Sequence, residues 1–450
     1  MALVEERTGE LRHQALHDSL TGLPNRTLVT DRAEQMLARA DREPIVPSVL
    51  FIDLDNFKDI NDSFGHQRGD QLLRAVAGRL AGLVRPGDSV GRLGGDAFVV
   101  LVQGRPADPG PEAVAERVLE GLAEPFHLEG MDGVALTVEA SIGVASASPG
   151  QSTDELLRDA DVALYEAKRG GKGRHMLFRP DMRLAVQDHL AIAMDLRHAI
   201  AKGELFVEYQ PTFELGTLVI AGVEALARWR HPTRGLVAPD QFIPVAEDSG
   251  LIAALGKYVL ASSCQQGAAW ARAGHPLQIS VNVSGHQLES EDFAAQVSET
   301  LAVSGLDPGL LTLELTESVL MRDADTSVRR LQALKKLGLK VAIDDFGTGY
   351  SSLARLRVLP VDALKIDRSF VAGIVGSRQA RTIAGSLVQL GKSLGLQVFA
   401  EGIEDEDQLA QLERLGCDYG QGFYYSRPLR PEVLAERFHL GRPLPGVPAL

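Results

Sequence analysis

Residues 340–349 read Lys-Val-Ala-Ile-Asp-Asp-Phe-Gly-Thr-Gly, a short apolar run that ends in two acidic residues and a glycine-containing turn. Such a run is typical of a buried strand, and a helical pattern follows it. Four similar runs lie nearby in the chain, at Leu277–Val283, Leu311–Leu315, Ala363–Ile366 and Gln397–Ala400. Because strands and helices alternate in this way from residue 190 to residue 436, the sequence predicts an α/β fold of the (β/α)8 barrel type.

Polar side chains stand where these strands end, which is where barrels of this type place their active sites. They are Glu224, Asn282, Glu314, Glu317, Asp344, Asp345, Lys365, Asp367, Glu401, Glu404 and Gln421. Each has a structural alternative: Asp344 alone fits a helix cap, and Glu224 with Lys365 fits a buried ion pair. Burial of a carboxylate at the end of one strand after another, however, lowers the stability of the fold unless a ligand or metal ion binds there. Oxygen ligands suit Mg²⁺ or Mn²⁺, and two such ions ~3.5–4 Å apart clamp the attacking and leaving oxygens of a phosphodiester.

Length and composition limit the class of protein. The chain has 450 residues, 45% of them hydrophobic, which suggests two or three domains. Its formal net charge of −14 argues against a partner that is a nucleic-acid polymer. Two cysteines, no long apolar run and a polar N-terminus predict a cytoplasmic location. Any sensory domain or membrane anchor is expected upstream of Met1.

The N-terminal part shows a second alternation of strands and helices. A helix is predicted up to Ala40, strands at Val49–Ile52, Ser89–Leu93 and Ala97–Val102, and a helix at Gly69–Leu83. We therefore expect an N-terminal helix at 1–15, an α/β domain at 16–178, a helical linker at 179–189, the barrel at 190–436 and a tail at 437–450.

The barrel region resembles the EAL domain family of cyclic di-GMP-specific phosphodiesterases. The resemblance covers the whole region and rests on Tyr209-Gln210-Pro211, Glu224-Ala225-Leu226, Asn282-Val283-Ser284, Thr316-Glu317-Ser318 and Asp344-Asp345-Phe346-Gly347. It implies hydrolysis of cyclic di-GMP to pGpG with two Mg²⁺ or Mn²⁺ ions.

The same resemblance implies roles for individual residues. The metal ligands would be Glu224, Asn282, Glu314, Asp344, Asp345 and Gln421. The catalytic residues would be Glu401 as general base, Lys365 as the group that stabilises developing charge, and Glu317 as the anchor of the loop after Asp345. Substrate contacts would come from Gln210, Arg228, Asp367 and Glu404.

Residues 14–178 resemble the GGDEF domain family of diguanylate cyclases. The match rests on Asp18–Arg26, Asp53–Lys58, Asn61–Asp70 and the signature Gly94-Gly95-Asp96-Ala97-Phe98. The resemblance implies a GTP site with one or two Mg²⁺ ions on Asp53 and Asp96. The other GTP contacts would be Lys58, Asn61, Asp70, Gly94, Gly95, Lys168 and Lys172.

One signature position departs from the family. Ala97 stands where an acidic residue is usual, and alanine neither binds metal nor accepts a proton. We therefore expect GTP binding and regulation with little cyclase activity.

Arg85 and Asp88 resemble the family's inhibitory cyclic di-GMP site, but they also fit a simple turn. We expect the protein to form a homodimer. The alternatives to a phosphodiesterase with a regulatory N-terminal domain are a bifunctional enzyme and a non-catalytic cyclic di-GMP receptor.

Overall fold

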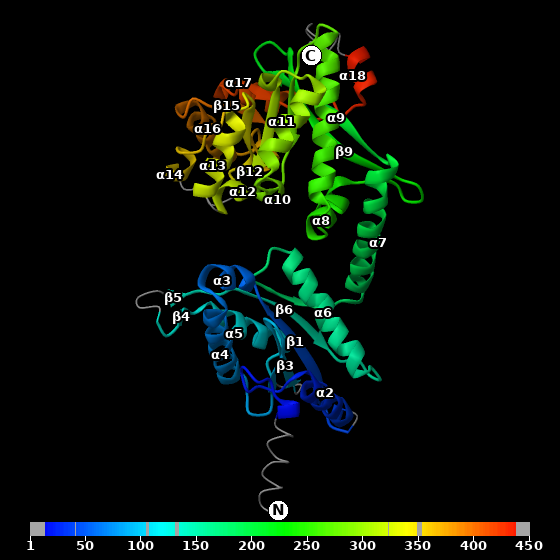
Figure 1. Cartoon of the computed structure of the whole chain (residues 1–450), viewed down its shortest axis with the longest axis vertical. Coiled ribbons are helices and arrows are strands. Elements are labelled where there is room, and N and C mark those ends of the chain that lie inside the picture. The colour runs from blue at the N-terminus through cyan, green and yellow to red at the C-terminus, as the bar shows by residue number, and fades with distance from the viewer. Residues whose placement is uncertain are drawn as a thin grey trace, which may run out of the picture. The chain divides into compact units, whose positions relative to one another are not determined.

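The computed structural model describes residues 14–40, 42–104, 108–130, 135–322, 324–348 and 353–437. The chain divides into two compact units, Met1–His189 and Leu190–Leu450 (Figure 1). Residues 1–13 of the expected N-terminal helix and residues 438–450 of the expected tail lie outside the described residues. In the described part, none of the helices has the length and apolar character that a membrane span requires.

The first unit contains a five-stranded sheet in the order β2-β3-β1-β6-β7. Its strands are β2 (Ser89–Gly94), β3 (Ala97–Gly104), β1 (Val46–Leu54), β6 (Ala140–Ser146) and β7 (His175–Leu177). The helices are α2 (Arg26–Ala40), α3 (Phe57–Phe64), α4 (His66–Leu83), α5 (Pro111–Ala123) and α6 (Thr153–Arg169). A two-stranded ribbon pairs β4 (Phe126–His127) with β5 (Ala135–Leu136). The predicted strands and helices of this part are therefore present.

Alternate residues of the central strand β1 face opposite sides of the sheet, as strand geometry requires. Leu50 and Ile52 pack with helices α4 and α5, whereas Val49 and Phe51 pack with α2 and α6. Both faces are thus covered, which explains why β1 reads as a continuous apolar run. Asp53 lies on the α2 and α6 side because it is two residues beyond Phe51.

The second unit is a closed barrel of eight strands. Its order is β9-β11-β12-β13-β14-β15-β16-β8, and pairing of β8 with β9 closes it. The strands are β8 (Leu205–Glu214), β9 (Ile220–His231), β11 (Gln278–Asn282), β12 (Leu311–Thr316), β13 (Lys340–Phe346), β14 (Ala363–Ile366), β15 (Gln397–Ala400) and β16 (Tyr419–Gly420). This architecture confirms the predicted barrel.

Helices surround the barrel and connect its strands (Figure 1). The longer ones are α7 (Pro180–Lys202), which enters from the first unit, α8 (Pro239–Asp248), α9 (Ile252–Arg272), α11 (Phe293–Ser304), α13 (Ala324–Lys335), α16 (Arg378–Ser393) and α17 (Glu406–Leu415). Shorter elements are β10 (Gly235–Val237), α10 (Gly285–Glu289), η1 (Pro308–Leu310), α12 (Glu317–Arg322), α14 (Leu353–Leu356), α15 (Arg368–Ala372) and α18 (Pro431–Arg437).

One strand departs from the all-parallel pattern of a (β/α)8 barrel. Strand β8 runs antiparallel to both of its neighbours, β9 and β16. The reason is the short connection at residues 215–219, since a tight turn joins only antiparallel strands. The residues before Gln210 therefore lie at the end of the barrel where the other strands finish.

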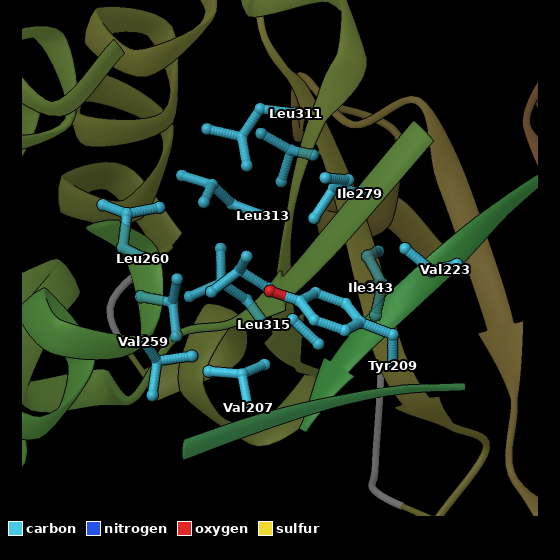
Figure 2. Packing of buried hydrophobic residues seen from close by; sticks show 14 of the residues in the cluster. Val207, Tyr209, Val223, Val259, Leu260, Ile279, Leu311, Leu313, Leu315 and Ile343 are labelled. Atoms are coloured by element: carbon cyan, nitrogen blue, oxygen red, sulfur yellow. The ribbon is translucent and has the colours of Figure 1, made fainter. Parts of the chain in front are cut away.

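The barrel core is built from the outward-facing side chains of its strands. Figure 2 shows Tyr209 of β8 and, from the same core cluster, valine, leucine and isoleucine side chains of β8, β9, β11, β12, β13 and helix α9. Tyr209 and Ile279 are 2% and 0% exposed, so this layer is closed to water. Such packing fixes the strands and hence the polar side chains at their ends.

Candidate active site

A buried lysine lies at the centre of the polar cluster. Lys365, on β14, is 2% exposed. Its Nζ lies 2.6 Å from Glu401 and 2.7 Å from Glu314. It also lies 3.2 Å from Glu224 and 3.3 Å from Asp344. Strand ends far apart in the sequence thus supply one cluster, as the strand-end pattern predicted.

The two consecutive aspartates of β13 reach this cluster through an irregularity of the strand. Neighbouring residues of a regular strand point to opposite faces. Here the pairing of β13 with β14 shifts register between Ile343 and Phe346, and Asp345 has φ of 53°. Positive φ is uncommon for residues other than glycine and marks local strain. Oxygens of Asp344, Asp345 and Glu401 consequently lie within 4.8 Å of one another.

Two amide side chains fix the orientation of Glu224. Asn282 Nδ2 donates to Glu224 Oε1 at 2.8 Å, and Gln421 Nε2 donates to Glu224 Oε2 at 2.6 Å. Gln421 Nε2 also lies 3.1 Å from Glu401 Oε1. Within the described residues, the buried Gln421 Oε1 accepts no hydrogen bond, and Asp344 Oδ1 has the 3.3 Å ion-pair contact with Lys365 but no hydrogen bond. Gln421 Oε1 therefore stays available for a ligand.

Burial and mutual repulsion shift the ionisation of these groups. Burial raises the pKa of Glu401 to about 8, and the nearby carboxylates of Asp344 and Glu224 oppose the stabilising Lys365. Burial likewise raises the pKa of Glu314 well above its usual value. Burial alone would lower the pKa of Lys365, but the surrounding carboxylates outweigh it and hold that pKa well above its usual range.

The cluster fits divalent cations. Five acidic side chains, those of Glu224, Glu314, Asp344, Asp345 and Glu401, share one mostly buried cluster with a single ammonium, so acidic groups outnumber cations there. Uncompensated buried charge is costly, and carboxylate and amide oxygens are ligands for Mg²⁺ and Mn²⁺. The acidic cluster, together with the acceptor Gln421 Oε1, can therefore hold metal.

Glu317 holds the segment that follows the two aspartates. It begins helix α12 directly after β12 and is 2% exposed. Its Oε2 accepts a hydrogen bond of 2.8 Å from the backbone N–H of Gly347. Gly347 has φ of 100° and a Cβ there would lie 2.8 Å from the ring of Phe370, so both space and backbone conformation favour glycine.

The four residues predicted to bind substrate have different partners. Gln210 Nε2 donates to the carbonyl of Ser426 at 3.3 Å, and Arg228 Nε lies 2.9 Å from Glu208. Asp367 Oδ1 accepts a hydrogen bond of 3.0 Å from Ser369 N at the start of α15. Glu404 is exposed, and among the described residues no hydrogen bond or ion pair joins its carboxylate to the cluster.

Asp53 and Ala97 lie opposite each other in the first unit, where β1 pairs with β3. Lys168 Nζ of α6 lies 2.6 Å from Asp53 Oδ1. Burial raises the pKa of Asp53 more than Lys168 lowers it. With alanine at position 97, that position adds no second carboxylate beside the Asp53–Lys168 pair.

Hydrogen bonds from Arg92 hold the signature turn in place. Arg92 Nε and NH2 donate to the carbonyl of Gly95 at 3.1 Å and 2.6 Å, and NH1 donates to Asp18 at 2.9 Å. Gly94 and Gly95 have φ of 128° and 57°, which explains both glycines. Asp96 occupies the turn between β2 and β3. Arg92 thus links Asp18 of the N-terminal motif to the signature turn.

The structure brings only some of the predicted GTP residues together beside this turn. A cavity of about 660 Å³ is lined by Asp53, Gly94, Ala97 and Lys168 but not by Asn61 or Asp70. Asn61 folds over helix α4, so that a Cβ at Gly69 would lie 2.0 Å from Asn61 Oδ1. Asp70 and Lys58 are exposed on α4 and α3.

Sequence reasoning missed Asp55, which fixes the loop after α6. Asp55 is 6% exposed and accepts hydrogen bonds from Ser141 Oγ at 2.9 Å and Gly173 N at 3.0 Å. In that loop, Lys172 has φ of 59° and its Nζ donates to Asn56 at 2.9 Å. The sequence pattern that could have identified Asp55 is its place as a second acidic residue, two positions after Asp53.

Arg85 and Asp88 each have partners within the first unit. Both carboxylate oxygens of Asp88 accept backbone N–H groups, from Arg85 at 3.2 Å and Gln103 at 3.2 Å. Arg85 NH1 lies 3.3 Å from Asp108. These contacts give Asp88 a role in the turn, and the inhibitory-site assignment stays a prediction.

Two family models match the chain, one on each unit. The model of the diguanylate cyclase GGDEF domain matches residues 15–174, and the EAL domain model matches residues 193–428.

Curated relatives contain the same regions within longer proteins. The bifunctional diguanylate cyclase/cyclic di-GMP phosphodiesterase MucR of Pseudomonas aeruginosa is 42% identical over 428 residues, which cover 94% of this chain and 62% of that protein. The cyclic di-GMP phosphodiesterase NbdA of the same organism is 39% identical over 441 residues, which cover 96% of this chain and 56% of that protein. This chain thus spans little more than half the length of these relatives.

A solved structure supports the barrel assignment. The phosphodiesterase structure of MucR in complex with cyclic di-GMP has 42% sequence identity and a TM-score of 0.53. It covers 54% of this chain and 99% of the solved chain.

Proposed function

The chain belongs to the EAL domain family, with a GGDEF domain before its EAL domain, and we propose that its barrel hydrolyses cyclic di-GMP to pGpG. The observation that carries this proposal is the buried Lys365 with carboxylates from Glu224, Glu314, Asp344 and Glu401 around it. A cluster in which acidic groups outnumber cations suits metal-assisted attack on a phosphodiester. The names of MucR and NbdA are consistent with this activity.

The proposed metal-holding residues are Glu224, Asn282, Glu314, Asp344, Asp345 and Gln421. Two Mg²⁺ or Mn²⁺ ions held there would neutralise charge on the phosphoryl oxygens and make an attacking water more acidic. Glu401 is the proposed proton acceptor, since its carboxylate lies beside Asp344 and Asp345. Lys365 holds four carboxylates in place and offers positive charge to the oxygens that gain charge. Glu317 keeps the backbone after Asp345 in position through Gly347.

The proposed substrate contacts are Gln210, Arg228, Asp367 and Glu404. Arg228 suits a phosphate oxygen because a guanidinium donates several hydrogen bonds in one plane. Gln210 pairs in register with Glu224, which places it next to the metal-holding residues.

For the first unit, we propose a GTP-binding module that regulates the barrel. Asp53, Asp96, Lys58, Asn61, Asp70, Lys168 and Lys172 supply the binding groups. Ala97 faces Asp53 without a carboxylate, so the unit keeps binding groups while it loses one needed for turnover. The bifunctional alternative is favoured only by the name of MucR.

One product assay distinguishes the candidate functions. Purified chain is incubated with cyclic di-GMP or with GTP, each with Mg²⁺ or Mn²⁺, and products are separated by chromatography. We expect pGpG from cyclic di-GMP, and neither cyclic di-GMP nor pGpG from GTP. Binding of cyclic di-GMP without any product would instead favour a receptor and would refute the phosphodiesterase proposal.

A further inference from the structure

An ion pair stands at the mouth of the barrel between its two antiparallel strands. Glu208 lies on β8 and Arg228 on β9, with Arg228 Nε 2.9 Å from Glu208 Oε2. Their side chains are 22% and 14% exposed, so each is largely enclosed. Nothing in the motif pattern marks Glu208, because the residues on either side of it belong to the outer, apolar layer.

Strand alternation places both residues on the inner face of the barrel. Thr212 and Gly222 line the interior cavity of about 70 Å³ together with Glu314 and Lys365, which identifies the inner face. Glu208 is four residues from Thr212, and Arg228 is six from Gly222, so both share that face. Because β8 is antiparallel, Glu208 lies beyond Gln210 toward the mouth, and Arg228 lies four residues, roughly 13 Å, beyond Glu224.

The guanidinium of Arg228 is held on two sides. Its Nε donates to Glu208 at 2.9 Å, and its NH1 donates to the carbonyl of Ala227 at 2.9 Å. Among the described residues, its NH2 donates to no protein group. Two of the five N–H groups of the guanidinium are thus engaged, and both N–H groups of NH2 are available for an anion.

We propose that Glu208 is a positioning residue, which orients Arg228 so that its available edge meets a substrate phosphate. This inference rests on the proposed function, since the anion is taken to be a phosphodiester of cyclic di-GMP. An unpaired arginine side chain samples many rotamers and must be ordered when a ligand binds. Glu208 supplies that order before binding, so the carboxylate acts on affinity through Arg228 rather than by touching substrate.

The test compares Glu208→Gln with Glu214→Gln, a change at the exposed end of the same strand. Glu208→Gln should raise KM for cyclic di-GMP about tenfold, leave kcat within about twofold and leave Tm unchanged. Glu214→Gln should leave all three values unchanged. In an Arg228→Ala background, Glu208→Gln should have no further effect on KM, because the group that it orients is gone.

Several outcomes would overturn the inference while the phosphodiesterase proposal stands. One is an unchanged or lower KM in Glu208→Gln, and another is a loss in kcat alone. The third is a double variant whose change in KM equals the product of the changes in Glu208→Gln and Arg228→Ala. If the wild type forms no pGpG, the phosphodiesterase proposal fails instead. Calorimetric titration of cyclic di-GMP in EDTA then tests the positioning role without turnover. Glu208→Gln should raise the Kd for cyclic di-GMP about tenfold over that of the wild type, and an equal Kd would refute the positioning role.

Discussion

Lys365 Nζ lies 2.6 Å from Glu401 Oε1, although Lys365 is on β14 and Glu401, 36 positions later in the sequence, directly follows the neighbouring strand β15. The lysine is 2% exposed, and it is also within ion-pair distance of Glu224, Glu314 and Asp344. A single ammonium therefore holds together acidic groups that would otherwise repel one another.

Replacement of Lys365 by Met should destabilise the metal-free protein strongly. Removing one partner from a buried ionic group leaves uncompensated charge and costs about 3–5 kcal/mol in the free energy of unfolding. The control is Lys392→Met, at a more exposed pair with Asp418, where a change below about 1 kcal/mol is expected. Denaturant unfolding in EDTA measures both. Equal losses would show that Lys365 does not hold the cluster together.

Addition of Mn²⁺ or Mg²⁺ should raise the Tm of the protein. An ion that binds only the folded state at about 100 times its Kd adds about 2.7 kcal/mol. Asp344→Ala should abolish most of this shift, whereas Asp407→Asn, an exposed change on α17, should preserve it. A full shift in Asp344→Ala would place the metal outside the proposed site.

The first unit should make little or no cyclic di-GMP from GTP. The assay uses an Asp344→Ala background, so that any product survives. Ala97 offers no carboxylate opposite Asp53, and loss of such a group commonly lowers turnover far more than binding. Strong synthesis in this background would refute the assignment of the first unit as a regulatory module without cyclase activity.

GTP should change the apparent KM or kcat for cyclic di-GMP. Asp70→Ala should remove the effect, because Asp70 is a proposed guanine contact. Coupling of binding sites is typically ~1–3 kcal/mol, which corresponds to about a 5- to 150-fold change. If GTP binds with no effect on hydrolysis, the regulatory role is wrong.

Both cysteines should resist thiol reagents in the folded protein. Burial raises the pKa of Cys264 and of Cys417 to about 12. Reaction requires the thiolate, whose share grows only as the pH rises toward that pKa, so little forms at pH 8. Reagent uptake should become fast only after unfolding. Rapid reaction of the native protein at pH 8 would contradict the buried positions.

Much of the fold was predictable because it depends on local periodicity. The strands at Ala363–Ile366 and Gln397–Ala400 have the predicted bounds, and the barrel follows from their alternation with helices. The reversed direction of β8 was not predicted, since it depends on the short turn at residues 215–219 and not on the apolar pattern of the strand itself.

The site was predictable in composition but not in geometry. Strand-end reasoning identified the residues that surround Lys365, whereas the register shift and positive φ that turn Asp345 toward Asp344 leave no clear pattern in the sequence. Glu208 was missed because its partner Arg228 is 20 positions away, and only the pairing of β8 with β9 brings them together. The assigned roles of the individual residues stay predictions.

The most direct test of the account is the rate of pGpG formation from cyclic di-GMP with Mn²⁺ in wild type, Glu224→Ala and Glu413→Ala. Glu224 is buried between Asn282, Lys365 and Gln421, whereas Glu413 is exposed on α17. We expect pGpG from wild type and Glu413→Ala at similar rates and none from Glu224→Ala, because the proposed metal site loses a ligand. Near-normal pGpG formation by Glu224→Ala, or none by the wild type, would contradict it.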